Sequence, residues 1–433
     1  MQPVKSYDPV TITIDQLDPA GYGLSADGKQ GVIGALAGET VIAVPWARKR
    51  KKHFFKTDTV SQASADRVTP ICPSANDCGG CSFQHFESIA QIRFKADNLQ
   101  ETLSATPPLL FMEPITGPTH DYRSKARLGV KFVEKKGRVL VGFREKMKPY
   151  VAEIERCFVL RASVGENLSA LAQVIGELSD PRSVPQIEVA VGDTQTALVI
   201  RHLGELTSSD LSQLSEFGRQ LQFDIYLQPG NESTVHKLFP ADGVERLKYS
   251  LPEFDLTYAF HPMDFTQVNH QINQKMIRRA IDLLALKDTD RVLDGFCGIG
   301  NFSLPLARTA GYVKGVELSQ TCVQRANENA VLNQLSNVEF AARDLFAENQ
   351  DKTELLGYNK VLLDPPRSGA FEVCKILATH QAERVVYVSC NPVTLARDAE
   401  ILVAGGYRFE SAGVIDMFPH TTHVESIACF TRP

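Results

Sequence analysis

The feature that most constrains the fold of this chain is an alternation of strand-like and helical segments after about residue 256. Short apolar segments such as RVLD (291–294) and KVLLD (360–364) alternate with amphipathic segments such as QINQKMIRRAIDLLAL (271–286). Alternating strands and helices form a parallel, doubly wound sheet, whose ligands bind beyond the carboxyl ends of the strands. The sequence therefore predicts an α/β, Rossmann-like domain with its site at that edge.

The rest of the chain predicts two further domains, in keeping with a length of 433 residues. Residues 10–60 contain the strand-like segments VTITI, GVIGA and ETVIAV between turn signals, which is typical of a small, OB-like antiparallel β-barrel. The following region mixes strands with the helical segment SSDLSQLSEFGRQL, an α+β pattern. We place the domains at 1–66, 67–255 and 256–433.

Charge is distributed unevenly along the chain. The net charge is −5, which argues against coating of nucleic acid by bulk charge. However, residues 47–56 carry six Lys/Arg with two phenylalanines, and residues 121–148 carry ten Lys/Arg against three acids. The first run also suits a solvated edge strand that resists aggregation. We interpret the two segments as a surface for a polyanion such as RNA.

The sequence contains no sign of export or membrane insertion. The first residues, MQPVKSYDPV, lack the apolar core of a signal peptide, and no run of about 18 apolar residues occurs. We therefore expect a cytoplasmic protein without a membrane partner. Disulfides are rare in that compartment, so the nine cysteines require another explanation.

A glycine-rich loop follows the first strand of the α/β region. It reads LDGFCGIGNF (293–302), and Glu317 ends the next strand 22 residues after Gly295. That spacing suits a carboxylate that accepts hydrogen bonds from ribose hydroxyls. Ser303 stands where a dinucleotide fingerprint needs its third glycine, so S-adenosylmethionine (SAM), which has a ribose but no pyrophosphate, fits better. The alternative is a turn that binds nothing.

Two later strands end in reactive side chains. Asp364 and Cys390 follow the fourth and fifth strands, so both should face the cofactor. A cysteine is useful when the target atom is a poor nucleophile, such as carbon 5 of a pyrimidine, because thiolate addition to carbon 6 activates it. Candidates for the base that completes the reaction are Glu425, His420 and His423. The two histidines could instead form structural hydrogen bonds or bind a metal.

Four cysteines form a candidate metal centre. Cys72-x5-Cys78-x2-Cys81, together with Cys157, supplies four thiolates. From the residues alone, zinc and an iron-sulfur cluster are equally favoured. The spacing is not Cys-x3-Cys-x2-Cys, which disfavours radical use of SAM. The remaining cysteines are interpreted as non-catalytic; they are Cys297, Cys322, Cys374 and Cys429.

Taken together, five motifs resemble those of the SAM-dependent RNA uracil-5 methyltransferases, in particular the 23S ribosomal RNA branch, over essentially the whole chain. The motifs are FTQVN (265–269), DGFCGIGNF (294–302), DPPR (364–367), SCNP (389–392) and HVES (423–426). The resemblance implies Cys390 as nucleophile and Glu425 as proton acceptor. It also implies a TRAM domain at the N-terminus and a [4Fe-4S] cluster on Cys72, Cys78, Cys81 and Cys157. The implied SAM contacts are Gln267, Phe296, Asn301, Glu317, Asp344 and Asp364.

We therefore expect a monomeric enzyme that methylates carbon 5 of a uridine in a single-stranded or locally unfolded segment of 23S ribosomal RNA. The DPPR form of the fourth motif is similar to other branches of the family, so a transfer-RNA T-loop uridine is an alternative substrate. A non-catalytic iron-sulfur RNA-binding protein is an alternative of another class. DNA is not expected as a substrate, because DNA cytosine C5-methyltransferases carry a Pro-Cys after strand four, where this chain has Asp364-Pro365-Pro366.

Overall fold

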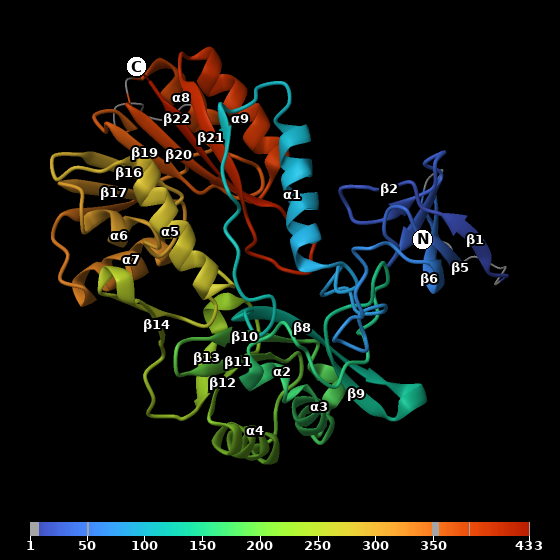
Figure 1. Ribbon diagram of the computed structural model, residues 1–433. Helices are drawn as coiled ribbons and strands as arrows, with labels where there is room; N and C mark the ends of the chain where they lie inside the picture. Colours follow the sequence, from blue (N-terminus) through green and yellow to red (C-terminus); the bar gives the residue numbers. More distant parts are fainter. Residues whose placement is uncertain (1–7, 50–51, 349–354, 381, 433) are drawn as a thin grey trace.

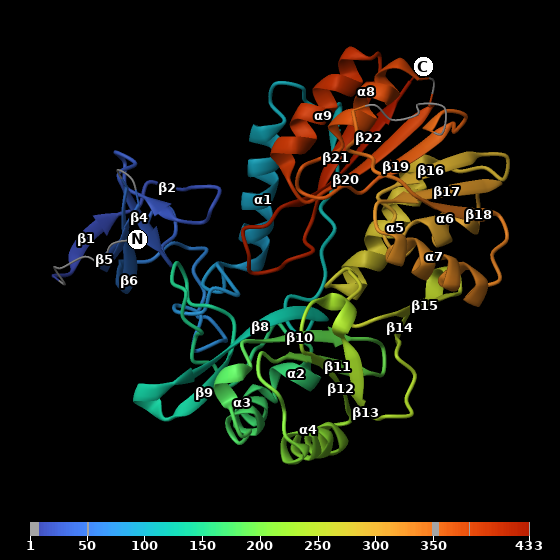
Figure 2. The same ribbon diagram turned by 180° about the vertical axis from the view of Figure 1, so that it is seen from behind.

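The computed structural model describes residues 8–49, 52–348, 355–380 and 382–432. The chain forms three bodies, which Figures 1 and 2 show from opposite sides. In Figure 1 the middle body (green) lies below the C-terminal α/β body (yellow to red), and the N-terminal sheet (blue) lies to the right. Within the described ranges, no helix combines the length and the apolar character needed to cross a bilayer.

The N-terminal sheet curls into a half-barrel with the strand order β1-β5-β6-β4-β3-β2. Ile12, Val32, Val41 and Phe55 fill its core. Neighbouring strands of this sheet are antiparallel except for β4 and β6, which are parallel. Strand β5, which follows β4 in the chain, lies on the other side of β6 and also pairs with β1. The strands are β1 (Val10–Thr13), β2 (Gln16–Leu17), β3 (Gly23–Leu24), β4 (Gln30–Ile33), β5 (Thr40–Lys49) and β6 (Lys52–Gln62).

The middle body is an α+β unit around the sheet β13-β12-β11-β10-β8-β9. The expected helix over 208–221 is present as α4, and it begins at a capping box in which Thr207 and Asp210 bond each other's backbone amides. The elements are β8 (Lys125–Val133), β9 (Arg138–Gly142), α2 (Ala162–Gly165), α3 (Leu168–Gly176), β10 (Gln186–Val191), β11 (Thr196–Arg201), α4 (Ser208–Leu221), β12 (Phe223–Gln228) and β13 (His236–Phe239).

The C-terminal body contains the predicted Rossmann-like sheet, with the order β18-β17-β16-β19-β20-β22-β21-β7. The strands from β18 to β20 are parallel as expected, whereas β22 is antiparallel to both of its neighbours. The elements are α5 (His270–Leu284), β16 (Arg291–Gly295), α6 (Ser303–Ala307), β17 (Tyr312–Glu317), α7 (Gln320–Leu332), β18 (Val338–Ala342), β19 (Lys360–Leu363), α8 (Phe371–Thr379), β20 (Arg384–Ser389), α9 (Pro392–Ala404), β21 (Arg408–Ile415) and β22 (Glu425–Thr431).

Both faces of this sheet are covered by helices, because successive strand residues point to opposite sides. Leu362 and Val386 belong to the core shared with α5 and α6, and their neighbours Val361 and Val385 belong to the core shared with α8 and α9. This arrangement leaves the carboxyl ends of the parallel strands as the edge at which a site can form.

Some segments that precede residue 256 also pack on the C-terminal body. The domain boundaries at residues 66 and 255 therefore stay predictions. Leu99 of α1 (Ser88–Thr102) joins the α8–α9 core, and β7 (Leu110–Phe111) extends the sheet beside β21. Tyr249 and Tyr258 join the α5 core from the hairpin of β14 (Leu247–Leu251) and β15 (Leu256–Phe260).

Candidate active site

The predicted cofactor loop follows β16 and has an unusual backbone. Phe296, Gly298 and Gly300 have φ angles of 66°, 56° and 89°. A positive φ is uncommon for a residue other than glycine and persists only where neighbouring contacts impose it. Here the Phe296 amide donates to the carbonyl of Val316 at 2.8 Å. A Cβ on Gly298 would meet no atom within 4 Å, so the loop presents open backbone at that point.

Two predicted acidic contacts lie at the ends of the next two strands. Glu317, the last residue of β17, accepts hydrogen bonds from the amides of Gly298 at 3.1 Å and Ser319 at 3.0 Å. Asp344 is exposed two residues beyond β18. The Arg343 amide donates to the Glu317 carbonyl at 2.8 Å, which holds the two strand ends together. The carboxylate that suits a ribose therefore lies directly beside the loop.

Two aspartates at the strand ends have raised pKa values. Burial raises the pKa of Asp294 to about 8 and that of Asp364, which follows β19, to about 7. The Oδ2 atom of Asp294 accepts from the Ser303 hydroxyl, whereas its buried Oδ1 has no partner among the described residues. A buried acceptor without a partner is costly, so the cleft suits a ligand that brings an N–H or O–H donor.

The rear of the loop is held by side chains that the sequence did not single out. Asn301, a predicted SAM contact, forms reciprocal amide hydrogen bonds with Asn273 of α5 at 2.9 and 3.0 Å. The Tyr258 hydroxyl donates to the Gly300 carbonyl at 3.2 Å, and the Tyr249 hydroxyl donates to Asn301 Oδ1 at 3.4 Å. The β14–β15 hairpin therefore fixes the end of the cofactor loop.

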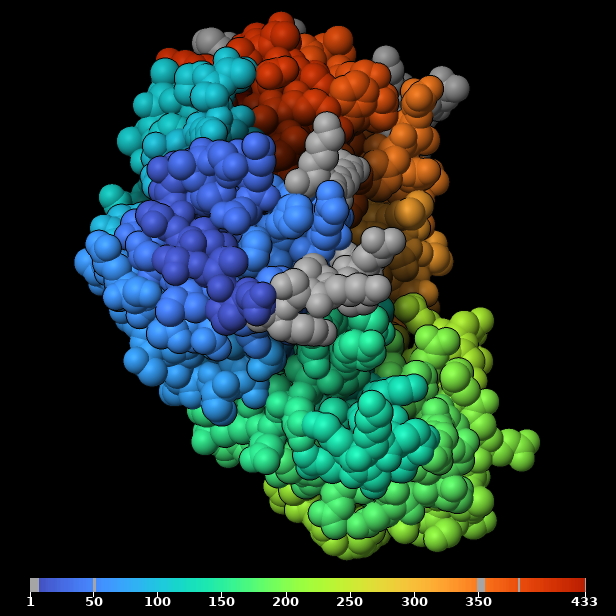
Figure 3. Space-filling view, turned by 90° about the vertical axis from the view of Figure 1, so that its right-hand side faces the viewer, coloured from blue at the N-terminus to red at the C-terminus, as the bar shows by residue number. Residues whose placement is uncertain are grey.

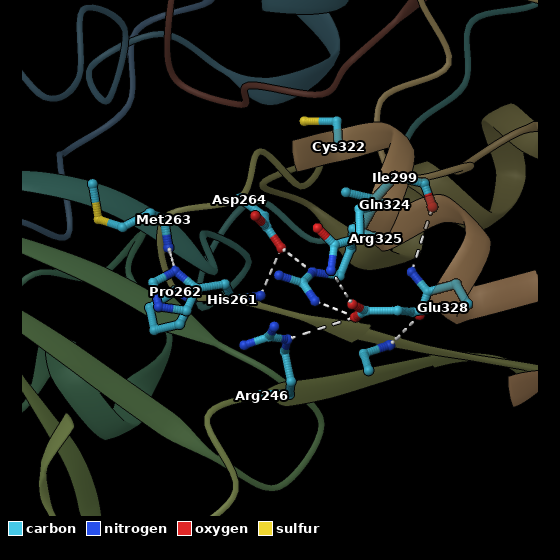
Figure 4. Close-up of polar contacts among 12 residues, drawn as sticks. Arg246, His261, Pro262, Met263, Asp264, Ile299, Cys322, Gln324, Arg325 and Glu328 are labelled. Atoms are coloured by element: carbon cyan, nitrogen blue, oxygen red, sulfur yellow. Dashed lines mark hydrogen bonds and ion pairs between the residues drawn. The ribbon is translucent and has the colours of Figure 1, made fainter. Parts of the chain in front are cut away.

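The segment before Gln267 is held by a buried ionic cluster (Figure 4). Asp264 pairs with Arg325 of α7 at 2.9 Å and accepts from the His261 amide at 2.7 Å. From the middle body, the Lys125 ammonium donates to the Asp264 carbonyl at 2.8 Å, and its withdrawal from water lowers its pKa to about 8. Gln267 itself is buried next to this anchored turn.

The predicted nucleophile and the predicted base lie at the ends of neighbouring strands. Cys390 follows β20 and Glu425 begins β22, and the antiparallel register pairs Ser389 with Ser426. Burial, together with the charges of Glu425 and Asp364, raises the pKa of the half-buried Cys390 thiol to about 11. Burial, followed by the charge of Asp364, raises the pKa of Glu425 to about 8. Both pKa values are raised because the acidic groups of Cys390, Glu425 and Asp364 lie near one another and are withdrawn from water.

Arg367 brings a positive charge to the acidic groups around Cys390, and no role is expected for it from the sequence. Its guanidinium opposes the raised pKa of both Cys390 and Glu425. Its carbonyl accepts from the Asn391 side chain at 2.9 Å, next to Cys390, and its Nη2 lies 3.3 Å from His423 Nδ1. The positive charge of Arg367 therefore stabilises the thiolate form of Cys390.

The two histidines near Glu425 occupy different environments. His423 is exposed beside Arg367. The ring of His420 is buried, contacts Gln91 and lies tilted by 48° against the His120 ring, with 4.9 Å between the ring centroids. Burial lowers the pKa of His420 to about 4. The structural reading of His420 therefore has direct support from its contacts.

The four candidate metal-binding cysteines come together. Cys72, Cys78, Cys81 and Cys157 line the same small cavity, although the last is 76 residues away from Cys81 in the sequence. Nowhere in the described ranges do three or more His, Cys, Asp or Glu side chains converge as the ligands of one metal ion. The cysteines share a cavity but not the tight convergence that a single ion requires.

The predicted basic segments are only partly free for a polyanion. Arg50 and Lys51 of the first segment lie outside the described residues, and Lys56 pairs with Asp77 at 2.5 Å. In the second segment, Arg127 pairs with Glu188, while Lys125 anchors backbone as described above. Lys146 and Lys148 of the second segment contact the N-terminal sheet. The Nζ atom of Lys148 lies 3.4 Å from the centre of the Trp46 ring, and Trp46 Nε1 donates to the Lys146 carbonyl at 3.3 Å. Figure 3 shows the N-terminal sheet (blue) against the neighbouring cyan and green segments.

Comparisons with known proteins identify the family of the chain. The sequence model of the family described as tRNA (Uracil-5-)-methyltransferase matches residues 194–432. The chain is 47% identical to the 23S rRNA (uracil(1939)-C(5))-methyltransferase RlmD of Alcanivorax borkumensis, and 44% identical to that of Legionella pneumophila strain Lens; each match covers 98% of this chain and 97% of the relative. The structure of Pyrococcus abyssi tRNA (uracil-54, C5)-methyltransferase, in complex with S-adenosyl-L-homocysteine, shares the fold with a TM-score of 0.77 at 23% identity, over 98% of this chain and all of that one. The chain therefore belongs to the family of SAM-dependent RNA uracil-5 methyltransferases.

Proposed function

We propose that this protein methylates carbon 5 of a uridine in 23S ribosomal RNA by way of a covalent bond between the enzyme and the base. The single observation that carries the proposal is the placement of Cys390 and Glu425 at adjoining strand ends, next to Asp364 and the cofactor loop. The RNA is assigned from the relatives named as 23S rRNA methyltransferases, which match the chain over nearly its full length.

Cys390 begins the reaction. Carbon 5 of uracil is a poor nucleophile, so the Cys390 thiolate adds to carbon 6 and the electron pair of the 5,6 double bond moves into the ring as an enolate. The thiolate must form from a thiol whose pKa is about 11 in the free protein, and Arg367 is the side chain that favours it. SAM supplies a methyl group on a positively charged sulfonium, which carbon 5 accepts as the sulfonium becomes a thioether.

Glu425 completes the reaction. After methylation, carbon 5 carries both a methyl group and its original proton, so the ring regains its double bond only when a base removes that proton. The Glu425 carboxylate takes the proton, the bond between carbon 6 and Cys390 Sγ breaks, and its electron pair returns to the sulfur. Burial raises the pKa of Glu425 to about 8, so the carboxylate that takes the proton is the minor form at neutral pH and becomes more abundant as the pH rises toward 8.

The residues that would hold SAM fit it chemically. Glu317 offers a carboxylate for the ribose, and the unpaired Oδ1 of Asp294 and the half-buried Asp364 offer acceptors for an ammonium group. Phe296 and Asn301 belong to the same loop, Gln267 precedes α5, and Asp344 follows β18. This chain's residues thus bind and orient the cofactor rather than activate it.

RNA binding is assigned to the N-terminal half-barrel, proposed as a TRAM domain, and to the basic part of the middle body around β8 and β9, at the edge of its sheet opposite β13. Between them lies a cavity of about 320 Å³ whose lining includes the aromatic residues Tyr22 and Phe143 and the exposed Arg144; Lys146 also lines it, and its ammonium donates to the Ala75 carbonyl at 2.6 Å. Aromatic and basic groups together suit an unpaired strand, whose bases stack and whose phosphates are neutralised. The target uridine then reaches Cys390 by leaving its stack.

The four cysteines are proposed to hold a [4Fe-4S] cluster that stabilises this region. The four cysteines line one cavity, and a [4Fe-4S] cluster takes one thiolate per iron, so they supply its full set of ligands. The methyl transfer above requires no redox step, so a structural role suffices.

The substrate assignment is tested by incubating the protein with radiolabelled SAM and either a 23S rRNA fragment or a transfer RNA, both prepared without modifications. We expect 5-methyluridine in the ribosomal fragment at a rate at least about tenfold above that in the transfer RNA. Preferential methylation of the T-loop uridine would instead assign the protein to transfer RNA.

A further inference from the structure

The segment Asp416–Val424 joins the end of β21 to Glu425 and leaves the body of the sheet. Figures 1 and 2 show this connection (red) reaching from the C-terminal body toward the lower end of α1. A base must lie within hydrogen-bond reach of the proton that it removes, so the way in which this connection is held bears directly on Glu425.

Helix α1 holds the start of the connection through a buried ion pair. The Lys95 ammonium donates to Asp416 Oδ1 at 2.7 Å and to the Phe418 carbonyl at 3.0 Å. Lys95 has no exposed surface, and Asp416 is 5% exposed. A lysine is almost never buried completely unless it is paired, so this side chain is committed to the connection.

One turn earlier on the same face of α1, Gln91 holds the middle of the connection. Its Oε1 accepts from the His420 amide at 2.9 Å, and its Nε2 lies 3.2 Å from His420 Nδ1. The His420 carbonyl accepts from the amides of Ser82 and Phe83 at 2.8 and 2.9 Å. His420 has a φ of 63°, a left-handed conformation that these contacts maintain.

We propose that Lys95 and Gln91 are positioning residues that set the location of the Glu425 carboxylate, and so control release of the methylated RNA. The proposal rests on the function proposed above, in which Glu425 acts only after methyl transfer. A buried ion pair often contributes no more stability than an apolar pair of similar volume, whereas its directed bonds fix one geometry for the connection. A displaced Glu425 therefore slows the final elimination while the earlier steps proceed.

The test uses the double variant Lys95→Met/Asp416→Leu, which leaves no buried charge unpaired. Its matched control is Lys237→Met/Asp224→Leu, which removes a 3.0 Å ion pair between β13 and β12, in the middle body. Each protein is mixed with SAM and an rRNA fragment containing ordinary uridine. Rapid quenching measures the first methyl transfer, and denaturing gels measure the fraction of enzyme bound covalently to RNA.

For the Lys95/Asp416 variant we expect a first turnover within about twofold of wild type, a steady-state rate at least about tenfold lower, and enrichment of the covalent adduct. The control should match wild type in all three. Gln91→Leu, which removes a neutral side chain and carries less risk to folding, should show the same pattern more weakly. SAM affinity, measured by calorimetry, should not change.

Two results would overturn the proposal: steady-state turnover equal to that of wild type, or first turnover and steady state falling together without adduct, as expected from general loss of structure. Covalent trapping of 5-fluorouridine RNA by the wild-type protein separates failure of this proposal from failure of the proposed function. If wild type traps the fluorinated RNA and the variant does not accumulate adduct on ordinary RNA, only the positioning role fails.

Discussion

Cys390 and Glu425 occupy facing strand ends: the register that pairs Ser389 with Ser426 places the residue after β20 opposite the first residue of β22. The charge of Glu425 raises the pKa of Cys390, and the charge of Asp364 raises the pKa of both. A nucleophile and a base held side by side on a rigid sheet suit a reaction that begins with addition at carbon 6 and ends with removal of a proton from carbon 5.

Replacement of the base should separate the two halves of the reaction. In Glu425→Gln the thiolate still adds and carbon 5 is still methylated, but no carboxylate removes the proton. We expect multiple turnover to fall by at least about 100-fold and the methylated RNA to remain attached to Cys390. Mass spectrometry of the denatured complex measures this adduct. A variant with wild-type turnover would remove Glu425 from the mechanism.

The same substitution should stabilise the free protein at neutral and alkaline pH. The pKa of Glu425 is about 8 in the folded protein and ordinarily about 4.5, so the folded state binds the extra proton between these values. Stability therefore falls by about 1.4 kcal/mol per pH unit from pH 4.5 to 8, and glutamine abolishes this loss. Thermal midpoints of Glu425→Gln should exceed those of wild type at pH 8 and coincide with them at pH 4; equal midpoints at pH 8 would contradict the assigned burial of charge.

Arg367 should lower the pKa of Cys390. Removal of its positive charge in Arg367→Met raises the thiol pKa above about 11, so less thiolate is present at any pH below that value. We expect iodoacetamide to alkylate Cys390 roughly threefold more slowly at pH 9 in this variant, because Arg367 is exposed and its effect is screened. Arg408→Met, at the exposed start of β21, is the control. Faster alkylation of Arg367→Met than of the control would refute the electrostatic role.

The ion pair of Asp264 and Arg325 should support both stability and SAM binding. Asp264→Asn leaves the buried Arg325 guanidinium with only the Glu328 carboxylate, which is partly exposed, and the lost charged hydrogen bond costs about 2 kcal/mol. Because Gln267 follows this turn closely, SAM affinity should also fall by about tenfold. Denaturant unfolding and calorimetry measure the two effects. Unchanged SAM affinity would show that the cluster in Figure 4 stabilises the turn without orienting Gln267.

The cysteine cavity should bind iron and sulfide. Protein purified without oxygen should contain about four irons and four acid-labile sulfides per chain, with broad visible absorption, and Cys78→Ala should lose both. Metal analysis distinguishes this result from zinc, which would contradict the assigned cluster. Because the proposed chemistry needs no electron transfer, any methylation that survives in Cys78→Ala should form the same 5-methyluridine.

Much of the C-terminal fold could be predicted because its strands are buried on both faces and read as apolar runs between amphipathic helices. The order of those strands in the sheet could not be predicted. Glu425 reaches Cys390 only because β22 inserts antiparallel between β20 and β21, a pairing of distant segments that no local pattern encodes. The sequence could therefore name both residues as candidates without indicating that they share one edge.

Charged residues were harder to interpret than apolar ones. Helix α1 carries many polar side chains, yet its Gln91 and Lys95 are buried because they bond the connection before Glu425. Lys125 belongs to a segment expected to face RNA, yet its ammonium anchors the turn that carries Asp264. In both cases the partner comes from a distant part of the chain, so composition alone assigns the charge to solvent or substrate.

The most direct test of the account is covalent trapping with a 23S rRNA fragment in which uridine is replaced by 5-fluorouridine. Fluorine at carbon 5 cannot leave as a proton, so the reaction should stop after methyl transfer with the RNA bound to Cys390. We predict one RNA and one methyl group per chain in an adduct that survives denaturation, its absence in Cys390→Ala, and its retention in Cys322→Ala. Methylation of ordinary rRNA without any adduct on the fluorinated fragment would contradict the covalent mechanism.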